Sequence, residues 1–113
     1  MKYIDYQTCI DACLSCADLC NHSASASLLV IEKKDTSTCI QLEMECAVIC
    51  YATAQLMSLG SQKVKEFCRI CAAMCEACAS ECEKFDFDHC KETAEACKLC
   101  TIECKKLEQT FKY

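Results

Sequence analysis

The stretch CRICAAMCEACASEC, residues 68–82, decides the fold of this 113-residue chain. Its five cysteines recur at intervals of three, four, three and four residues. On a helix that advances about 100° per residue, this spacing places all five on one face. The stretch therefore predicts an α-helix whose inward stripe, which in most proteins is leucine and isoleucine, consists of sulfur.

Three other stretches of the chain carry cysteines at heptad spacing. Their intervals are 4-3-4 in the first, 7-4 in the second and 7-3-4 in the last. The pattern predicts four helices, each with one stripe of thiols. In chain order the sixteen cysteines are Cys9, Cys13, Cys16 and Cys20; Cys39, Cys46 and Cys50; Cys68, Cys71, Cys75, Cys78 and Cys82; and Cys90, Cys97, Cys100 and Cys104.

Few residues interrupt these helices, because the chain has no proline and a single glycine. Gly60 stands where a helix C′ residue is expected, and Ser61 can cap the helix that follows. Thr36 or Ser37 can cap the second helix. Short connections predict an all-α fold, an antiparallel up-down-up-down four-helix bundle that forms one domain over residues 1–113. We expect the helices at about residues 5–32, 37–59, 62–84 and 88–111.

Composition excludes several classes of function. The net charge is −5, which makes nucleic acid a poor partner. No run of about 18 apolar residues predicts a membrane span. The first residues lack the apolar region of a signal peptide, so we expect a cytoplasmic protein. No catalytic triad, phosphate-binding loop or carboxylate pair is visible, so we do not expect an enzyme.

Sixteen inward thiols require a chemical explanation. Packing alone would favour aliphatic side chains, which do not oxidise. Disulfides are hard to form between neighbours on one helix, because their Cβ vectors run nearly parallel. Copper(I) is a soft ion that prefers thiolate and thioether ligands. The stripes therefore predict a lumen that binds and stores many copper(I) ions.

Two alternatives remain open at this point. One is a general soft-metal buffer or detoxification protein for zinc or cadmium, although structural zinc sites usually use cysteine pairs on loops. The other is an iron-sulfur or dithiol redox protein. The second is disfavoured because the characteristic ferredoxin spacing of cysteines is absent.

The four cysteine stripes resemble those of the bacterial copper storage proteins, and the resemblance covers almost the whole chain. It implies a four-helix bundle filled with copper(I), assembled as a homotetramer, with this chain similar to the cytosolic members. It also implies a ligand role for all sixteen cysteines. Copper chaperones or small thiols would be the expected donors.

Antiparallel packing of the helices predicts which side chains lie at the same height, or level, along the lumen and which lie at its two ends. Glu43, Thr53 and Thr93 interrupt the stripes. We expect copper to enter at the end with His89, and Met57 to lie in an apolar plug at the other. Met57 and His89 are candidate accessory metal ligands. The simpler interpretation is that Met57 only packs in the apolar plug and that His89 is an exposed residue near a helix cap. One predicted level holds Cys20, Cys50, Cys71 and Cys100; the next holds Cys46, Cys75 and Cys97 with Ser23 or Ala24; one end holds Cys39, Cys82 and Cys90; the plug holds Met57, Val64, Leu107 and Phe111.

Overall fold

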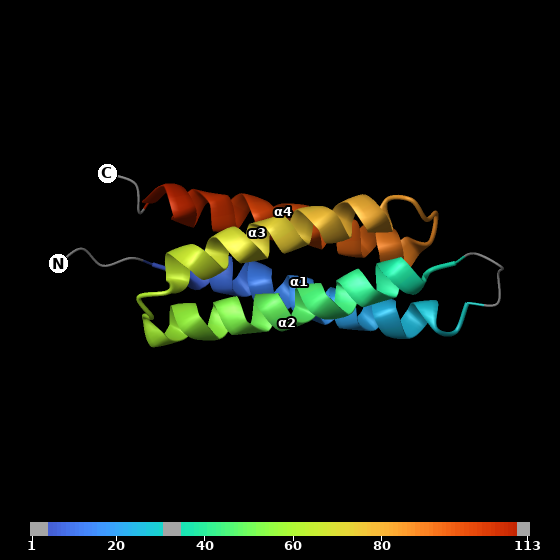
Figure 1. The fold of residues 1–113 in the computed structure, drawn as a ribbon, viewed down its shortest axis with the longest axis horizontal. Helices are drawn as coiled ribbons and strands as arrows, with labels where there is room; N and C mark the ends of the chain where they lie inside the picture. The colour runs from blue at the N-terminus through green and yellow to red at the C-terminus, as the bar shows by residue number, and fades with distance from the viewer. Residues whose placement is uncertain (1–4, 31–34, 111–113) are drawn as a thin grey trace.

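The computed structural model describes residues 5–30 and 35–110, which form four α-helices. Successive helices run in opposite directions, as Figure 1 shows. This architecture confirms the predicted all-α four-helix bundle. The helices are α1 (Gln7–Ser27), α2 (Ser37–Leu59), α3 (Val64–Cys82) and α4 (Asp88–Thr110).

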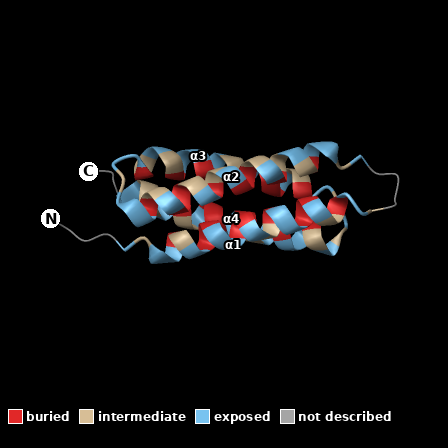
Figure 2. Ribbon diagram, turned by 90° about the horizontal axis from the view of Figure 1, so that it is seen from below, coloured by how far each residue is buried: buried red, intermediate tan, exposed pale blue. Residues whose placement is uncertain are grey.

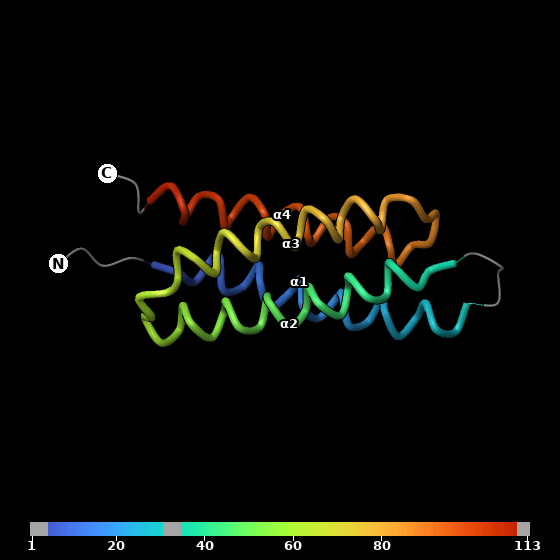
Figure 3. Tube along the Cα trace, in the orientation of Figure 1, coloured from blue at the N-terminus to red at the C-terminus, as the bar shows by residue number. Residues whose placement is uncertain are grey.

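Each helix packs against two neighbours, so the bundle is square in cross-section. The packed pairs are α1–α2, α2–α3, α3–α4 and α1–α4, while in the described residues no Cα atoms of a diagonal pair of helices lie within 8 Å of each other. The start of α1 and the end of α4 lie at the same end of the bundle as the α2–α3 turn (Figure 3). The other two connections lie at the opposite end, and the helices therefore enclose a single central lumen.

The helix starts are fixed by side chains just outside the helices. Asp35 Oδ1 accepts hydrogen bonds from the Ser37 N–H at 3.0 Å and the Ser37 Oγ–H at 2.6 Å. Thr36 occupies the N-cap position of α2, as expected, but its side chain makes no capping hydrogen bond, and Asp35 satisfies the N–H of Ser37 instead. Ser61 Oγ accepts from the Lys63 N–H at 3.0 Å, within the turn that leads into α3.

Gly60 ends α2 in the left-handed conformation, with φ 65° and ψ 36°. The N–H groups of Gly60 and Ser61 donate to the carbonyls of Met57 and Leu56, at 3.1 and 3.0 Å. This is a Schellman motif, which needs a positive φ that glycine adopts without strain. The prediction for Gly60 is confirmed.

The first helix is shorter than the sequence pattern suggested. It ends at Ser27 and not near residue 32, and α3 begins at Val64 and not at residue 62. The side chain of Leu28 is 73% exposed, so no neighbouring helix favours a further turn there. Residues 31–34 and Phe111 lie outside the described residues.

Small residues close the seams between the helices. The buried positions face the middle of the bundle in Figure 2 and are mostly cysteine and alanine. Larger side chains beside the cysteine stripes, among them Leu14, Leu28, Ile70, Leu99 and Ile102, are exposed. Alanine lets the helices approach more closely and leaves these larger side chains outside. Among the described helices, none has the length and apolar composition that crossing a bilayer requires.

Candidate metal centre

All sixteen cysteines are buried and free, and they come from all four helices. Fifteen are fully inaccessible to solvent and Cys9 is 3% exposed. Their sulfurs meet across the lumen in cross-helix contacts of 3.6–4.0 Å. The lumen is therefore a continuous column of thiols.

Two adjacent layers at the centre consist of cysteine alone, one from each helix. In the first, Sγ distances of 3.6–3.8 Å link α1 to α4, α2 to α3 and α3 to α4. In the second, all measured distances lie between 3.6 and 4.0 Å. A contact of 3.8 Å between Cys50 and Cys75 joins the two layers. The first central layer holds Cys13, Cys50, Cys71 and Cys100, and the second holds Cys16, Cys46, Cys75 and Cys97.

A third layer flanks the centre on the side of the chain termini. The Sγ atoms of Cys9 and Cys104 are 3.7 Å apart, and Cys68 completes a group whose sulfurs all lie within 4.8 Å of one another. The α2 position of this layer is Thr53, whose Oγ1 donates to the Ile49 carbonyl at 2.7 Å. Because that hydroxyl is satisfied by its own helix, it fills the fourth position without competing for a metal.

A fourth layer, the Glu43 layer, lies on the other side of the centre. It combines the thiols of Cys20 and Cys78 with Glu43 and Thr93, all fully buried. Thr93 Oγ1 bonds to the carbonyls of His89 at 2.8 Å and Leu19 at 3.3 Å. Burial raises the pKa of the Glu43 carboxyl, whose Oε1 has no hydrogen-bond partner.

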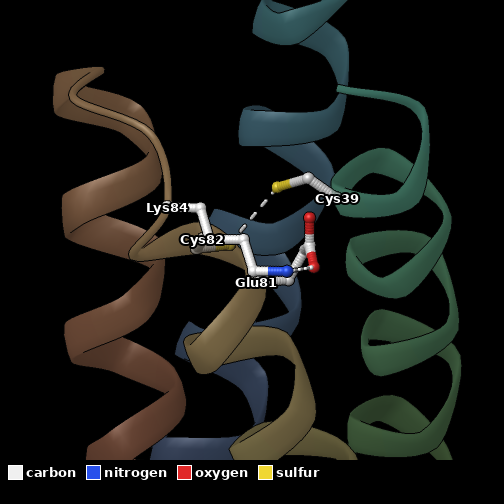
Figure 4. Close-up of polar contacts among 4 residues, drawn as sticks. All are labelled: Cys39, Glu81, Cys82 and Lys84. Atoms are coloured by element: carbon white, nitrogen blue, oxygen red, sulfur yellow. Dashed lines mark hydrogen bonds and ion pairs between the residues drawn. The ribbon is translucent and has the colours of Figure 1, made fainter. Parts of the chain in front are cut away.

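The last layer faces the end of the bundle that carries His89. Here the Sγ atoms of Cys39 and Cys82 lie 3.6 Å apart, as Figure 4 shows. His89 is half-buried, and its Nδ1 lies 3.0 Å from Ser23 Oγ and 3.6 Å from the sulfur of Cys90. Burial lowers the pKa of the imidazole. His89 thus touches a candidate ligand and is not a freely exposed cap.

Two stacked aromatic contacts hold His89 in place. The Phe85 and Phe87 rings stack with centroids 6.2 Å apart, and Phe87 stacks on the imidazole at 5.4 Å. This stack was not predicted from the sequence, although aromatic and polar residues alternate at positions 85–89.

The predicted levels are right for three helices and wrong for α1. Cys50, Cys71 and Cys100 share a layer as expected, but Cys13 occupies the place assigned to Cys20. These two cysteines are seven residues apart, about two helical turns. Because α1 ends earlier than predicted, its turn is centred nearer the N-terminus. In an antiparallel helix pair, moving the centre of the turn by one residue changes which residues lie opposite each other by two. The earlier turn therefore brings an earlier cysteine of α1 level with Cys50.

The opposite end of the lumen is closed by apolar side chains. Met57 is 2% exposed and Val64 is 1% exposed. Tyr6 and Leu107 pack against the same core, and the contribution of Tyr6 was not predicted from the sequence. Phe111, the remaining member of the expected plug, lies outside the described residues.

Hydrogen bonding among the thiols divides them into donors and acceptors. Contacts from Cys104 and Cys13 lower the pKa of the Cys100 thiol to about 7. Contacts with Cys100, Cys20 and Cys46 lower the pKa of Cys16, and the contact with Cys16 in turn raises that of Cys20. These contacts therefore favour the ionised form of thiols such as Cys16 and Cys100, which is the form that binds soft metal ions.

Comparisons with known proteins agree with this chemistry. A family model described as copper storage protein matches residues 3–109. The uncharacterized cysteine-rich protein YhjQ of Bacillus subtilis is 42% identical over 85 residues, which covers 75% of this chain and 79% of that protein.

Two solved structures also resemble this bundle. The copper(I)-bound copper storage protein BsCsp3, from Bacillus subtilis, has a TM-score of 0.88 and 40% identity, covering 91% of this chain and 97% of that one. A cytosolic copper storage protein from Streptomyces lividans, with five coppers, has a TM-score of 0.87 and 34% identity. That match covers 91% of each chain.

Proposed function

The chain belongs to the copper storage protein family, and we propose that it binds and stores many copper(I) ions on the thiolates of its lumen. The observation that carries the proposal is the pair of adjacent all-cysteine layers, with Sγ atoms 3.6–4.0 Å apart. A thiolate can bridge two soft ions, so all sixteen cysteines act as ligands and capacity approaches one copper per cysteine. Binding releases the thiol protons.

The proposal makes the protein a metal store and not an enzyme. Residues 1–113 act as a single domain, because the described helices share one lumen. Copper chaperones or small thiols deliver the ions. The protein works in the cytoplasm, as the similar Streptomyces lividans protein does. Copper enters beside His89, because the other end is closed by Met57 and Val64.

The proposal is tested by titrating reduced, metal-free protein with copper(I) under anaerobic conditions against a competing chelator. The expected result is tight binding of roughly as many ions as there are cysteines. The double variant Cys16→Ser/Cys97→Ser should bind fewer ions, while the exposed control Ser15→Ala should bind as many as the parent protein. Saturation at one or two ions per chain would contradict storage.

We further propose that the chain forms a homotetramer through its exposed apolar side chains. Met44, Val48 and Tyr51 lie on one face of α2, where Val48 is 65% exposed. Leu99 and Ile102 form a second exposed group on α4. Patches of this kind mark protein interfaces. Native mass spectrometry should show four copies, and the double variant Val48→Glu/Leu99→Glu should give smaller species. A parent protein that stays monomeric at micromolar concentration would refute the assembly.

A further inference from the structure

The end of the lumen at His89 carries a different set of donor atoms from the central layers. The carboxylate of Glu43 points toward the thiols of the last layer, and its Oε2 lies 3.5 Å from the sulfur of Cys82. It also interacts with the Cys39 thiol, and the Cys90 thiol interacts with both Cys39 and Glu43. Two sulfurs and one carboxylate oxygen therefore lie in contact, with the Cys90 thiol within electrostatic reach of them, whereas the central layers offer sulfur alone.

The spacing of these donors matches a tetrahedral zinc site. Zinc bonds of about 2.3 Å to sulfur and about 2.1 Å to oxygen give tetrahedron edges of about 3.8 Å between sulfurs and about 3.6 Å between sulfur and oxygen. The measured distances are 3.6 Å for Cys39–Cys82 and 3.5 Å for Cys82–Glu43. These two distances suit one ion that contacts Cys39, Cys82 and Glu43, with Cys90 as its fourth ligand.

Glu43 has one carboxylate oxygen without a hydrogen-bond partner, and a bound cation would supply a partner for it. Its side chain is fully buried, and Oε1 has no hydrogen-bond partner. Among the described residues, no lysine or arginine is buried beside it. A buried carboxylate without a counter-charge is costly, and a carboxylate oxygen is a poor ligand for copper(I) but a normal one for zinc.

We propose that Cys39, Cys82, Cys90 and Glu43 form a binding site for one zinc-class divalent ion. Three thiolates, one carboxylate and Zn²⁺ carry a net charge of −2, the same as in a four-cysteine zinc site. Copper(I) fills the all-sulfur layers first. When copper reaches the last three thiolates, it displaces the zinc, with no change in the oxidation state of either metal.

The test uses Zn²⁺ alone on the reduced, metal-free full chain, in competition with a chromophoric chelator. One ion should bind tightly. The Glu43→Gln substitution should weaken the affinity for Zn²⁺ at least about tenfold. The matched control Glu45→Gln, on the same helix, should leave the affinity for Zn²⁺ unchanged. Both variants should retain the copper(I) capacity of the parent, so this outcome is separate from the storage titration.

A second measurement identifies the ligands through Co²⁺ as a spectroscopic probe. The site should give tetrahedral d–d bands and thiolate-to-cobalt charge transfer. Cys39→Ser should remove about a third of the charge-transfer intensity, because one of three thiolates is lost. Cys9→Ser, at the far end, should change nothing. Absence of tight zinc binding, equal affinity in the Glu43→Gln and Glu45→Gln proteins, or greater sensitivity to Cys9→Ser than to Cys39→Ser would each overturn the proposal.

Discussion

Glu43 occupies a position on the α2 stripe where a cysteine would continue the heptad spacing, in a layer that also contains Thr93. The sequence placed it on the inward face through its spacing from Cys39 and Cys46. Spacing alone left two interpretations, a rim residue that reaches solvent or a carboxylate inside the lumen. The structure shows a fully buried carboxyl next to Cys82. Which partners it meets depends on the pairing of α2 with α3, and a single helix pattern does not encode that pairing.

The burial of Glu43 predicts that the stability of the metal-free protein falls as the pH rises. Because burial raises its pKa above the unfolded value, the protonated carboxyl favours the folded state. That contribution is full below the unfolded pKa and is lost as pH rises through the folded pKa. Glu43→Gln should therefore raise the thermal midpoint by a few degrees at pH 7.5, and by less at pH 4. Thermal unfolding across this range checks it, and an equal gain at both pH values would contradict the explanation.

The four helices and their inward faces could be predicted from the sequence, because cysteine intervals of three, four and seven allow one amphipathic solution. The up-down connectivity followed from short connections. The relative height of α1 could not be predicted, since it depends on where α1 stops. The first helix was expected to run to about residue 32, but Leu28 already lies beyond its end and is exposed. As a result, the Cys13, Cys50, Cys71 and Cys100 layer was predicted with Cys20 in place of Cys13.

Gly60 offers a test of how α2 and α3 are joined. A Cβ at this position would meet no atom within 4 Å, so a substitution should cost only backbone strain. Gly60→Ala should lower the free energy of unfolding by roughly 1 kcal/mol, the cost of a non-glycine residue in the left-handed region. The exposed control Ser58→Ala should stay within about 0.5 kcal/mol of the parent. Chemical denaturation of the reduced protein measures both, and an unchanged Gly60→Ala protein would refute the strain argument.

At the scale of the whole molecule, the two ends of the lumen are chemically different. The end with the chain termini and the α2–α3 turn is closed by Met57 and Val64, packed with Tyr6. The opposite end presents a half-buried imidazole, a carboxylate and three thiols. We therefore expect ions to be exchanged at the end that is lined with ligands.

This asymmetry predicts different kinetic effects at the two ends. His89→Ala should slow copper(I) uptake severalfold in stopped-flow measurements, because an incoming ion loses the nitrogen ligand beside Cys90. The final number of ions should not change. Met57→Leu preserves the apolar packing and should leave the rate unchanged. If copper(I) uptake were slower in Met57→Leu and unchanged in His89→Ala, the entry path would lie at the other end of the lumen.

The most direct test of the account is the metal content of the protein isolated anaerobically from copper-supplemented cells. A column of sixteen buried thiols predicts copper as the dominant metal, at many ions per chain, in a colourless protein. A protein with only one or two copper ions, or a brown protein that contains iron and labile sulfide, would contradict the central claim.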